Sequence, residues 1–357
     1  MKILAVDIGA GTEDILLYDD RKRIENCVKM ILPSPSQFLA AKVGEATISR
    51  KDIFVEGDII GGGAFTLALK THLERKLQVF MTERTAYTLR NDLDEVRQLG
   101  IEIVEYESLP RNFKGERLRI EEINLLKLKE FLEYFGESLL DVDLVAIAVQ
   151  DHGVSPKNMS DRRFRLQMMK EFLERDPSPE SLAFLEEAVP PCFLRMKSAV
   201  QASKRQLPEA RVLVMDTSPA AILGCLHDPI VKRATHVLVV NVGNNHTMAT
   251  IVSKGEVVGI MEHHTSRLNP PKIKKLLVDF SEGKVSDEEV FKDEGHGVFF
   301  LINPPGFSKI DIVAVTGPNR DILNSTKLNV HFASPAGDMM MTGPIGLIEA
   351  VKKKVKN

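Results

Sequence analysis

Five short apolar runs, each followed by polar or glycine residues, limit the fold of this chain more than any other feature. The runs are residues 3–6, 144–149, 212–215, 237–240 and 311–315. They are rich in β-branched residues and do not alternate with polar ones, which is typical of strands that helices cover on both faces. The segments DIGAGT, QDHG, DTSPA, NVGNNHT and TGPN follow them directly. Because ligands of open α/β sheets bind at the carboxyl ends of strands, the sequence predicts an α/β fold in which these segments converge on one site.

Helical patterns lie between the apolar runs. Helices are predicted at residues 120–135, 163–175, 220–226 and 338–356. The last of these ends in lysines, where the helix dipole favours cations. With 357 residues, the chain is long enough for two domains or one bilobal unit.

The charge balance and the cysteines exclude several classes of protein. The net charge is −3, whereas binding to nucleic acid or to an acidic membrane requires a basic surplus. Cys27, Cys192 and Cys225 are far apart in the sequence, so there is neither a disulfide framework nor a CxxC metal motif. We find no targeting segment and no apolar run near the ~18 residues of a membrane span. The sequence therefore predicts a cytoplasmic protein without a nucleic-acid or membrane partner.

Five segments, taken in order, resemble the superfamily of actin, sugar kinases and heat-shock chaperone ATPases. They are LAVDIGAGTEDILLYD (residues 4–19), VMDTSPAAILGCL (214–226), HVLVVNVGNNHTMATIV (236–252), DIVAVTGPNRDIL (311–323) and SPAGDMMMTGPIGLIEAV (334–351). In that order they resemble the first phosphate hairpin, the connecting strand and helix, the second phosphate hairpin, the adenosine-binding strand and the closing helix. The resemblance implies an actin-like (ribonuclease H-like) bilobal fold, with two domains around a central cleft. We expect a first domain at 1–226 with an excursion at about 154–207, a second at 227–332, and a C-terminal helix at 333–357 that returns to the first.

The resemblance also implies a site for ATP and Mg²⁺ in the cleft. Asp7 would hold Mg²⁺ as a catalytic group, and the backbone at Gly9, Gly11 and Thr12 would approach the phosphates closely. The alternative is a plain tight hairpin whose turn Asp7 caps. Further nucleotide contacts are expected from the second loop and the adenosine turn, at Gly243, Asn244, Asn245, His246, Thr247, Thr316 and Gly317.

The second loop departs from the pattern of the superfamily. Asn241 stands where a chaperone-type ATPase has an aspartate. Loss of this carboxylate argues against efficient metal-assisted hydrolysis of ATP. An alternative interpretation of the loop is a type I′ hairpin turn at Asn244 and Asn245.

More closely, the sequence resembles a prokaryotic family often labelled "putative pyruvate formate-lyase activating enzyme". The segments AVQDHG, GNNHT, EHHT and DEGHG carry this resemblance. The label implies a radical enzyme whose iron–sulfur cluster is held by three cysteines in CxxxCxxC, because such clusters need thiolate ligands. The chain has no such motif, so it is not a radical iron–sulfur activating enzyme.

Five histidines in polar loop motifs are the unusual feature of the sequence. They are His152, His246, His263, His264 and His296, and acidic residues accompany several of them. Such groups supply metal ligands or general acids and bases. We expect a transition metal at His246, His263, His264 and His296, and a general base at Asp151 or His152. The alternative is that these histidines are hydrogen-bonded structural residues.

Two further features allow an anion-binding and a structural interpretation. The glycines at 61–63 precede a predicted helix, where backbone amides form an anion site, and a turn is an equal alternative. Arg162, Arg163, Arg165 and Arg195 would either clamp an anionic substrate or form salt bridges.

We therefore predict an ATP-binding protein, with Mg²⁺-dependent phosphotransferase or ATPase chemistry in the interdomain cleft. Two alternatives stay open. One is a nucleotide-gated protein that activates a partner by domain closure. The other is a metal-dependent hydrolase that uses the histidine loops. The sequence does not predict the oligomeric state or whether the second partner is a small molecule or a protein.

Overall fold

Two large β-sheets with the same core strand order form the framework of the protein. The computed structural model describes residues 1–105 and 113–356. The first sheet has the order β3-β2-β1-β8-β10-β9 and the second has the order β14-β13-β12-β11-β15-β16. In each, antiparallel strands lead to a central strand that pairs in parallel with the next one, β1 with β8 and β11 with β15. This repeated order is the two-domain architecture that the resemblance implied, so the expected actin-like fold is confirmed.

The five apolar runs became central strands, because continuous β-branched sequence favours burial on both faces. The first sheet consists of β1 (Lys2–Ile8), β2 (Thr12–Asp19), β3 (Val28–Pro33), β8 (Leu144–Val149), β9 (Ala183–Leu185) and β10 (Arg211–Met215). The second consists of β11 (His236–Val242), β12 (His246–Ser253), β13 (Glu256–His264), β14 (Gly297–Phe300), β15 (Ile312–Thr316) and β16 (Val330–Phe332). The predicted runs therefore lie in β1, β8, β10, β11 and β15.

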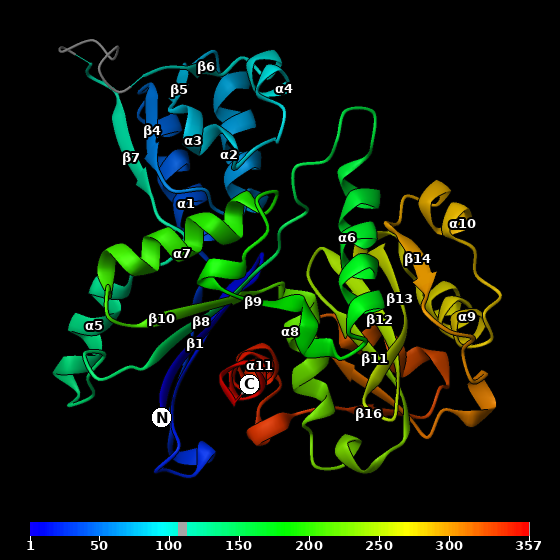
Figure 1. Ribbon diagram of the computed structural model, residues 1–357. Coiled ribbons are helices and arrows are strands. Elements are labelled where there is room, and N and C mark those ends of the chain that lie inside the picture. Colours follow the sequence, from blue (N-terminus) through cyan, green and yellow to red (C-terminus); the bar gives the residue numbers. More distant parts are fainter. Residues whose placement is uncertain (106–112, 357) are drawn as a thin grey trace.

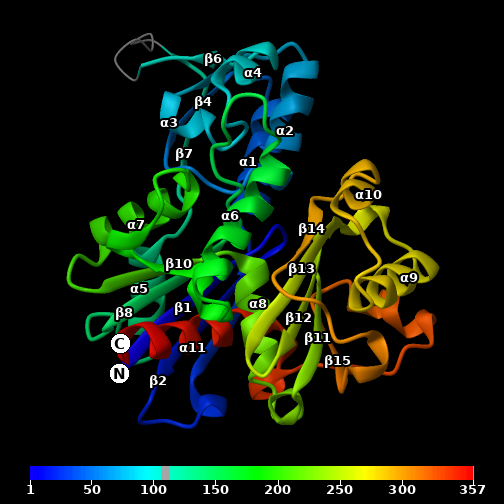
Figure 2. The ribbon, with the colours of Figure 1, turned by 45° about the vertical axis from the view of Figure 1, so that its right-hand side comes forward.

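Two helices, α8 (Thr217–Leu226) and α11 (Thr342–Lys356), lie between the two large sheets (Figures 1 and 2). Their backbones touch, because a Cβ at Gly224 would lie 1.8 Å from the Thr342 carbonyl oxygen, and one at Gly346 would lie 1.9 Å from that of Ala220. The outer face of the first sheet is covered by α5 (Leu125–Tyr134) and α7 (Leu194–Gln206). The outer face of the second is covered by α9 (Pro270–Ser281) and α10 (Asp287–Lys292).

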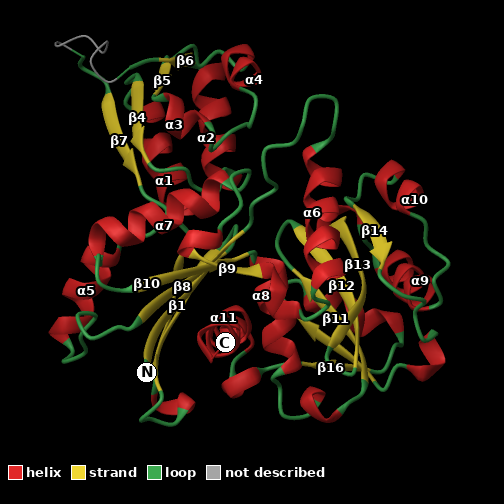
Figure 3. Ribbon diagram, in the orientation of Figure 1, coloured by secondary structure: helices red, strands yellow, loops and turns green. Residues whose placement is uncertain are grey.

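A third, smaller sheet was not predicted from the sequence (Figure 3). Its parallel strands are β6 (Glu102–Ile103), β5 (Val79–Met81), β4 (Ile53–Gly57) and β7 (Glu116–Ile120), in this order. The helices of this unit are α1 (Pro35–Ile48), α2 (Gly63–Glu74), α3 (Glu83–Ala86) and α4 (Leu93–Gln98). It has its own apolar core and is inserted between β3 and β8.

The predicted excursion at 154–207 contains α6 (Asp161–Arg175), β9 and α7. Helix α6 packs against β14 of the second sheet (Figure 1). The division of the chain at residues 226 and 332 stays a prediction, although α11 does pack against β1 and α8. Within the described residues, no helix combines the length and apolar character needed to cross a bilayer.

Candidate functional site

A cavity of about 850 Å³ lies where the third-sheet unit meets the loops of both large sheets. Its walls include the β1–β2 turn, the tip of β8, the start of α2, the start of α6 and the β11–β12 turn. Six of the predicted site residues line it, namely Gly9, Asp151, His152, Asn245, His246 and His264. The convergence of strand ends expected from the sequence therefore produces a real cavity.

The glycine segment forms one wall of the cavity and allows a close approach of Arg195. A Cβ at Gly61 would lie 2.8 Å from Nη2 of this arginine. The guanidinium of Arg195 forms a two-pronged ion pair with the buried carboxylate of Glu122, with both N–O distances 2.8 Å. It also donates to the carbonyl oxygen of Gln150. Arg195 therefore fixes the tip of β8 against the inserted unit, which matches the salt-bridge interpretation of this arginine.

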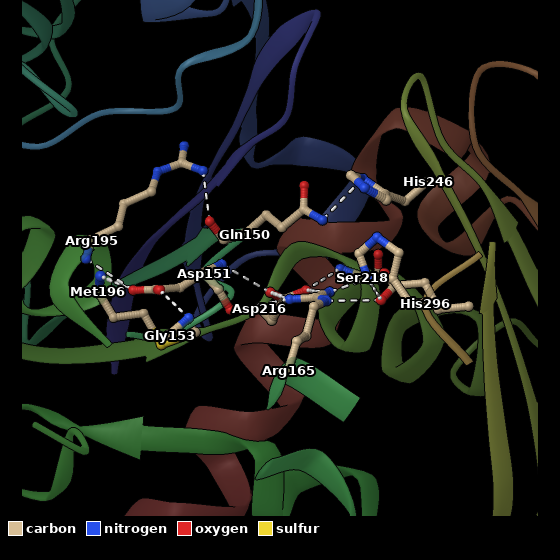
Figure 4. Close-up of polar contacts among 11 residues, drawn as sticks. Gln150, Asp151, Gly153, Arg165, Arg195, Met196, Asp216, Ser218, His246 and His296 are labelled. Carbon is tan, nitrogen blue, oxygen red and sulfur yellow. Dashed lines mark hydrogen bonds and ion pairs between the residues drawn. The ribbon is translucent and has the colours of Figure 1, made fainter. Parts of the chain in front are cut away.

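Asp151 holds the start of α7 in place. Its Oδ2 accepts hydrogen bonds from the backbone N–H groups of Arg195 and Met196, at 2.9 and 3.0 Å, and Oδ1 accepts one from Gly153 (Figure 4). Burial raises the pKa of this carboxyl, and the backbone donors oppose that rise. With both oxygens in use, Asp151 has a clear positioning role in the described structure.

Asp7, which is half-buried, and Asp14, which is buried, form a carboxylate pair beside the first hairpin turn. They face each other in the antiparallel register of β1 and β2, so their side chains lie on one face of the sheet. Oδ1 of each is buried and has no hydrogen-bond partner among the described residues. Burial and mutual repulsion raise the pKa of Asp7 well above its ordinary value. Burial raises the pKa of Asp14 to about 7.

The surroundings of this pair fit a hard cation. Gly343, at the start of α11, packs so closely that a Cβ there would lie 1.9 Å from Oδ2 of Asp7. Unpartnered carboxylate oxygens are the ligands that Mg²⁺ prefers, and a cation would relieve the repulsion that keeps them protonated. Asp7 and Asp14 are therefore the residues that could hold Mg²⁺. The sequence analysis missed Asp14, which could have been found only from the hairpin register.

The second phosphate loop contacts the first. A Cβ at Gly11 would lie 2.7 Å from Nδ2 of Asn244, so the two hairpin turns touch. Neither Asn244 nor Asn245 has a positive φ, so the type I′ alternative for this turn is wrong. Thr12 is half-buried at the start of β2. Gly243 donates its N–H to the His246 carbonyl at 2.9 Å and closes the second turn.

The remaining residues of the predicted nucleotide site pack around this turn. Thr247 is buried, and its hydroxyl lies 3.0 Å from that of Thr265. Thr316 is also buried and donates to the Thr342 hydroxyl at 3.1 Å. Gly317 has φ +96° and lies against the backbone of Val242. The turns predicted to face the adenosine and the phosphates are thus neighbours.

Four histidines gather at the other end of the cavity. The ring of His246 lies 4.8 Å from that of His296, 4.9 Å from His264 and 5.8 Å from His152, measured between centroids. Burial lowers the pKa of His246 to about 3 and the pKa of His152 well below its ordinary value. The pKa of His264 is also lowered by burial. The imidazoles of His152, His246 and His264 are therefore neutral at pH 7 and keep a lone pair for a metal or a proton.

His263 does not join this group, although the sequence analysis counted it among the metal ligands. Its Nε2 lies 3.1 Å from Asp293 and its Nδ1 lies 3.2 Å from the His264 carbonyl oxygen. Because β13 residues alternate between faces, adjacent histidines point in opposite directions. The structure instead brings in His152, which the sequence analysis had assigned only as a candidate base.

A buried charge network lies behind the histidines (Figure 4). Arg165, on α6, pairs with Asp216 at the start of α8 and with Glu262 on β13. Glu262 Oε2 in turn lies 3.0 Å from Nδ1 of His296. The positive neighbours hold the pKa of Glu262 well below its ordinary value despite burial. Arg165 is therefore a structural ion-pair residue, whereas Arg162 lines the cavity and Arg163 forms an exposed pair with Glu288.

Three of the solved structures that resemble this chain do so at low sequence identity. A protein of Listeria monocytogenes described as "a putative N-acetylmannosamine kinase" is 10% identical, with 100% of both chains covered and a TM-score of 0.38. A Bacteroides thetaiotaomicron protein described as having an actin-like ATPase fold and unknown function is 11% identical, with 96% of this chain and 95% of that chain covered and a TM-score of 0.35. A Cytophaga hutchinsonii protein described as "a putative sugar kinase" is 10% identical, with 98% and 100% covered and a TM-score of 0.33. No curated protein matches the chain.

The fold and the cavity thus define an actin-like α/β protein with a histidine-lined interdomain site. The chain belongs to the DUF1786 family, whose model carries the description "Putative pyruvate format-lyase activating enzyme" and matches residues 60–322.

Proposed function

We propose that the protein binds ATP with Mg²⁺ beside the two hairpin turns and transfers a phosphoryl group to an acceptor in the cavity, or to water. The observation that carries the proposal is the carboxylate pair of Asp7 and Asp14, in which one buried oxygen of each residue has no hydrogen-bond partner among the described residues. Uncompensated buried carboxylates are costly unless a cation joins them. Glycine turns next to such a pair suit phosphate oxygens.

Each part of the site has a distinct task in this proposal. Bound Mg²⁺ would neutralise charge on the transferred phosphate, which is the main requirement of such reactions. The turns at residues 9–12 and 243–247 would hold the phosphates, and Thr316 with Gly317 would lie toward the adenosine. Since the two turns are in contact at Gly11 and Asn244, ATP would enter as they separate.

The acceptor would occupy the cavity between the turns and the inserted unit. Its walls offer the backbone of residues 61–63 at the start of α2 and the side chain of Arg162. Both suit an anionic or hydroxylated molecule. Asp151 is engaged by backbone donors. We therefore assign the acceptance of the acceptor's proton to the histidine end of the cavity, where His152 lies.

The test is nucleotide binding by the purified full chain, measured by isothermal titration calorimetry with ATP in the presence and absence of Mg²⁺. We expect Mg²⁺-dependent binding that Asp7→Asn and Asp14→Asn each weaken at least tenfold. Asp94→Asn is the control, because this carboxylate is exposed on α4 and its ion pair in the described part of the chain is with Arg97. Phosphate release or transfer is then followed with the same variants. Equal ATP binding by all variants, or none by the wild type, would overturn the proposal.

A further inference from the structure

The histidine end of the cavity forms a second candidate site, which does not depend on nucleotide binding. One ring nitrogen from each of His152, His246 and His296 lies within 4.8 Å of the other two. Two nitrogens on one tetrahedral zinc ion lie about 3.4 Å apart, since each bond is about 2.0–2.1 Å long. Small rotations about the side-chain bonds, about 1–2 Å at the ring nitrogens, are enough to place all three on one ion.

His296 is the most deeply buried of the three candidate ligands. Its side chain is completely buried, and neither ring nitrogen makes a hydrogen bond among the described residues. Its Nδ1 lies 3.0 Å from Glu262 Oε2, and a small rotation of the ring would let the Nδ1–H donate to this carboxylate and leave the lone pair on Nε2. Histidines that ligate metals are oriented by a carboxylate in this way. A buried ring nitrogen without a hydrogen-bond partner or a ligand would destabilise the folded protein.

His246 is held by a similar contact. Its Nδ1 lies 2.9 Å from the side-chain amide of Gln150 (Figure 4). A half-turn of that amide would bring its oxygen to the same place, where it would accept the Nδ1–H and leave the Nε2 lone pair free. With the Gln150 amide turned in this way and Nδ1–H of His296 donated to Glu262, both imidazoles would present Nε2 to a metal.

We propose that His152, His246 and His296 form a site for a divalent transition metal, such as zinc, that bridges the two large sheets and keeps an open coordination position toward the cavity. His152 follows β8 of the first sheet, whereas His246 starts β12 and His296 precedes β14 of the second. His152 and His246 also line the cavity, while His296 is closed off behind them. Three imidazoles with an open position are typical of catalytic rather than structural zinc sites.

The open coordination position would allow the metal to bind an oxygen atom in the cavity. A water molecule or a substrate oxygen can fill it, and the metal then lowers the pKa of that group. The substrate that supplies this oxygen would be an anionic or hydroxylated molecule small enough to enter the cavity. In this arrangement His152 is a metal ligand rather than the base assigned above, and the metal would lower the pKa of the bound oxygen so that its proton is released to solvent.

The test uses metal-free full-length protein titrated with Co²⁺ and followed by visible absorption, with zinc competition and elemental analysis to count ions. We expect one ion per chain with a spectrum of four or five ligands, and displacement by zinc. His152→Gln and His296→Gln should each weaken binding at least 100-fold, and Glu262→Gln should weaken it 10–100-fold through the orientation of His296. His152→Gln keeps the test valid if the buried variants unfold, because His152 lies at the cavity wall.

His263→Gln is the matched control, because this neighbouring histidine pairs with Asp293 and points away from the group. It should leave the Co²⁺ spectrum and affinity unchanged. The inference is overturned if the wild type binds less than one ion per chain at saturation, or if His263→Gln weakens binding as much as His152→Gln. ATP binding measured in the same variants separates this outcome from failure of the proposed function.

Discussion

Arg165 lies against Glu262 with its Nε 2.8 Å from Oε2, and neither side chain is more than 1% exposed. The arginine is on α6 and the glutamate is on β13, while the other face of the guanidinium reaches Asp216 at the end of β10. The three charges therefore tie the second sheet to the first through a helix of the excursion. Removing one of these side chains leaves the buried charges of the others without an opposite charge nearby.

Replacement of this arginine should be severe. Arg165→Met is expected to lower the free energy of unfolding by about 3–5 kcal/mol, because two buried carboxylates lose their partner. Arg163→Met, two residues earlier on the same helix, removes a half-exposed pair with Glu288 and a cation–π contact with Phe291, and should cost about 1 kcal/mol. Urea unfolding of both variants measures the difference. Equal costs would show that the buried network contributes little.

The stability of Asp14→Asn relative to the wild type should depend on pH. The pKa of Asp14 is raised from 3.8 to about 7 in the folded protein, so folding retains a proton that the unfolded chain releases. This contribution to stability is fully present below about pH 4 and is lost as the pH rises through 7. In metal-free buffer, the melting temperature of Asp14→Asn should therefore rise relative to that of the wild type from pH 4 to 7. Above pH 7 the difference should stay constant. A constant difference across this range would contradict the pKa shift.

The contact between Gly343 and Asp7 should tolerate no side chain. In Gly343→Ala the new methyl group would lie 1.9 Å from Oδ2 of Asp7, so the carboxylate or α11 must move. We expect a loss of about 1–3 kcal/mol from overpacking, together with weaker binding of Mg²⁺ and ATP. Gly44→Ala is the control, because nothing lies within 4 Å of its Cβ position on α1 and the change should stabilise the helix by about 0.5–1 kcal/mol. Unaltered ATP binding by Gly343→Ala would argue against a cation at Asp7.

The inserted unit should be sensitive to acid through His72. This histidine is buried on α2, its Nδ1 lies 2.8 Å from the Thr47 hydroxyl, and burial lowers its pKa below 6.5. Its neutral form contributes stability that is present above pH 6.5 and lost as the pH falls below it. Hydrogen exchange of α1 and α2 should therefore accelerate below pH 6.5 in the wild type and much less in His72→Gln. The same acid response in both proteins would assign the effect to other groups.

The central strands were predictable because each is a continuous run of β-branched residues that only a doubly covered strand can bury. The third sheet was not, because β5 and β6 are three and two residues long and β7 alternates charge with apolar side chains. Strands of this length carry too little pattern to separate them from loops. The sequence therefore predicted the framework of the cavity but not the unit that closes it.

The candidate site was predictable only in part, for the same physical reason. Strand order brings the ends of β1 and β8 together, so Gly9 and His152 could be expected at one place. Asp14 and the role of Asp151 depend on pairings across the hairpin and with α7, and one sequence does not reveal such pairings. His263 and His264 differ only in the face of β13 that they occupy, and a shift of one residue in register reverses that choice.

The main-chain contact between α8 and α11 has a genetic consequence. At Gly224 and Gly346 the atom that a methyl group would strike is a backbone carbonyl oxygen of the facing helix, which every amino acid carries. No substitution at a facing position can make room for it. A selection for suppressors of Gly224→Ala should therefore return reversions to glycine rather than compensating replacements in α11.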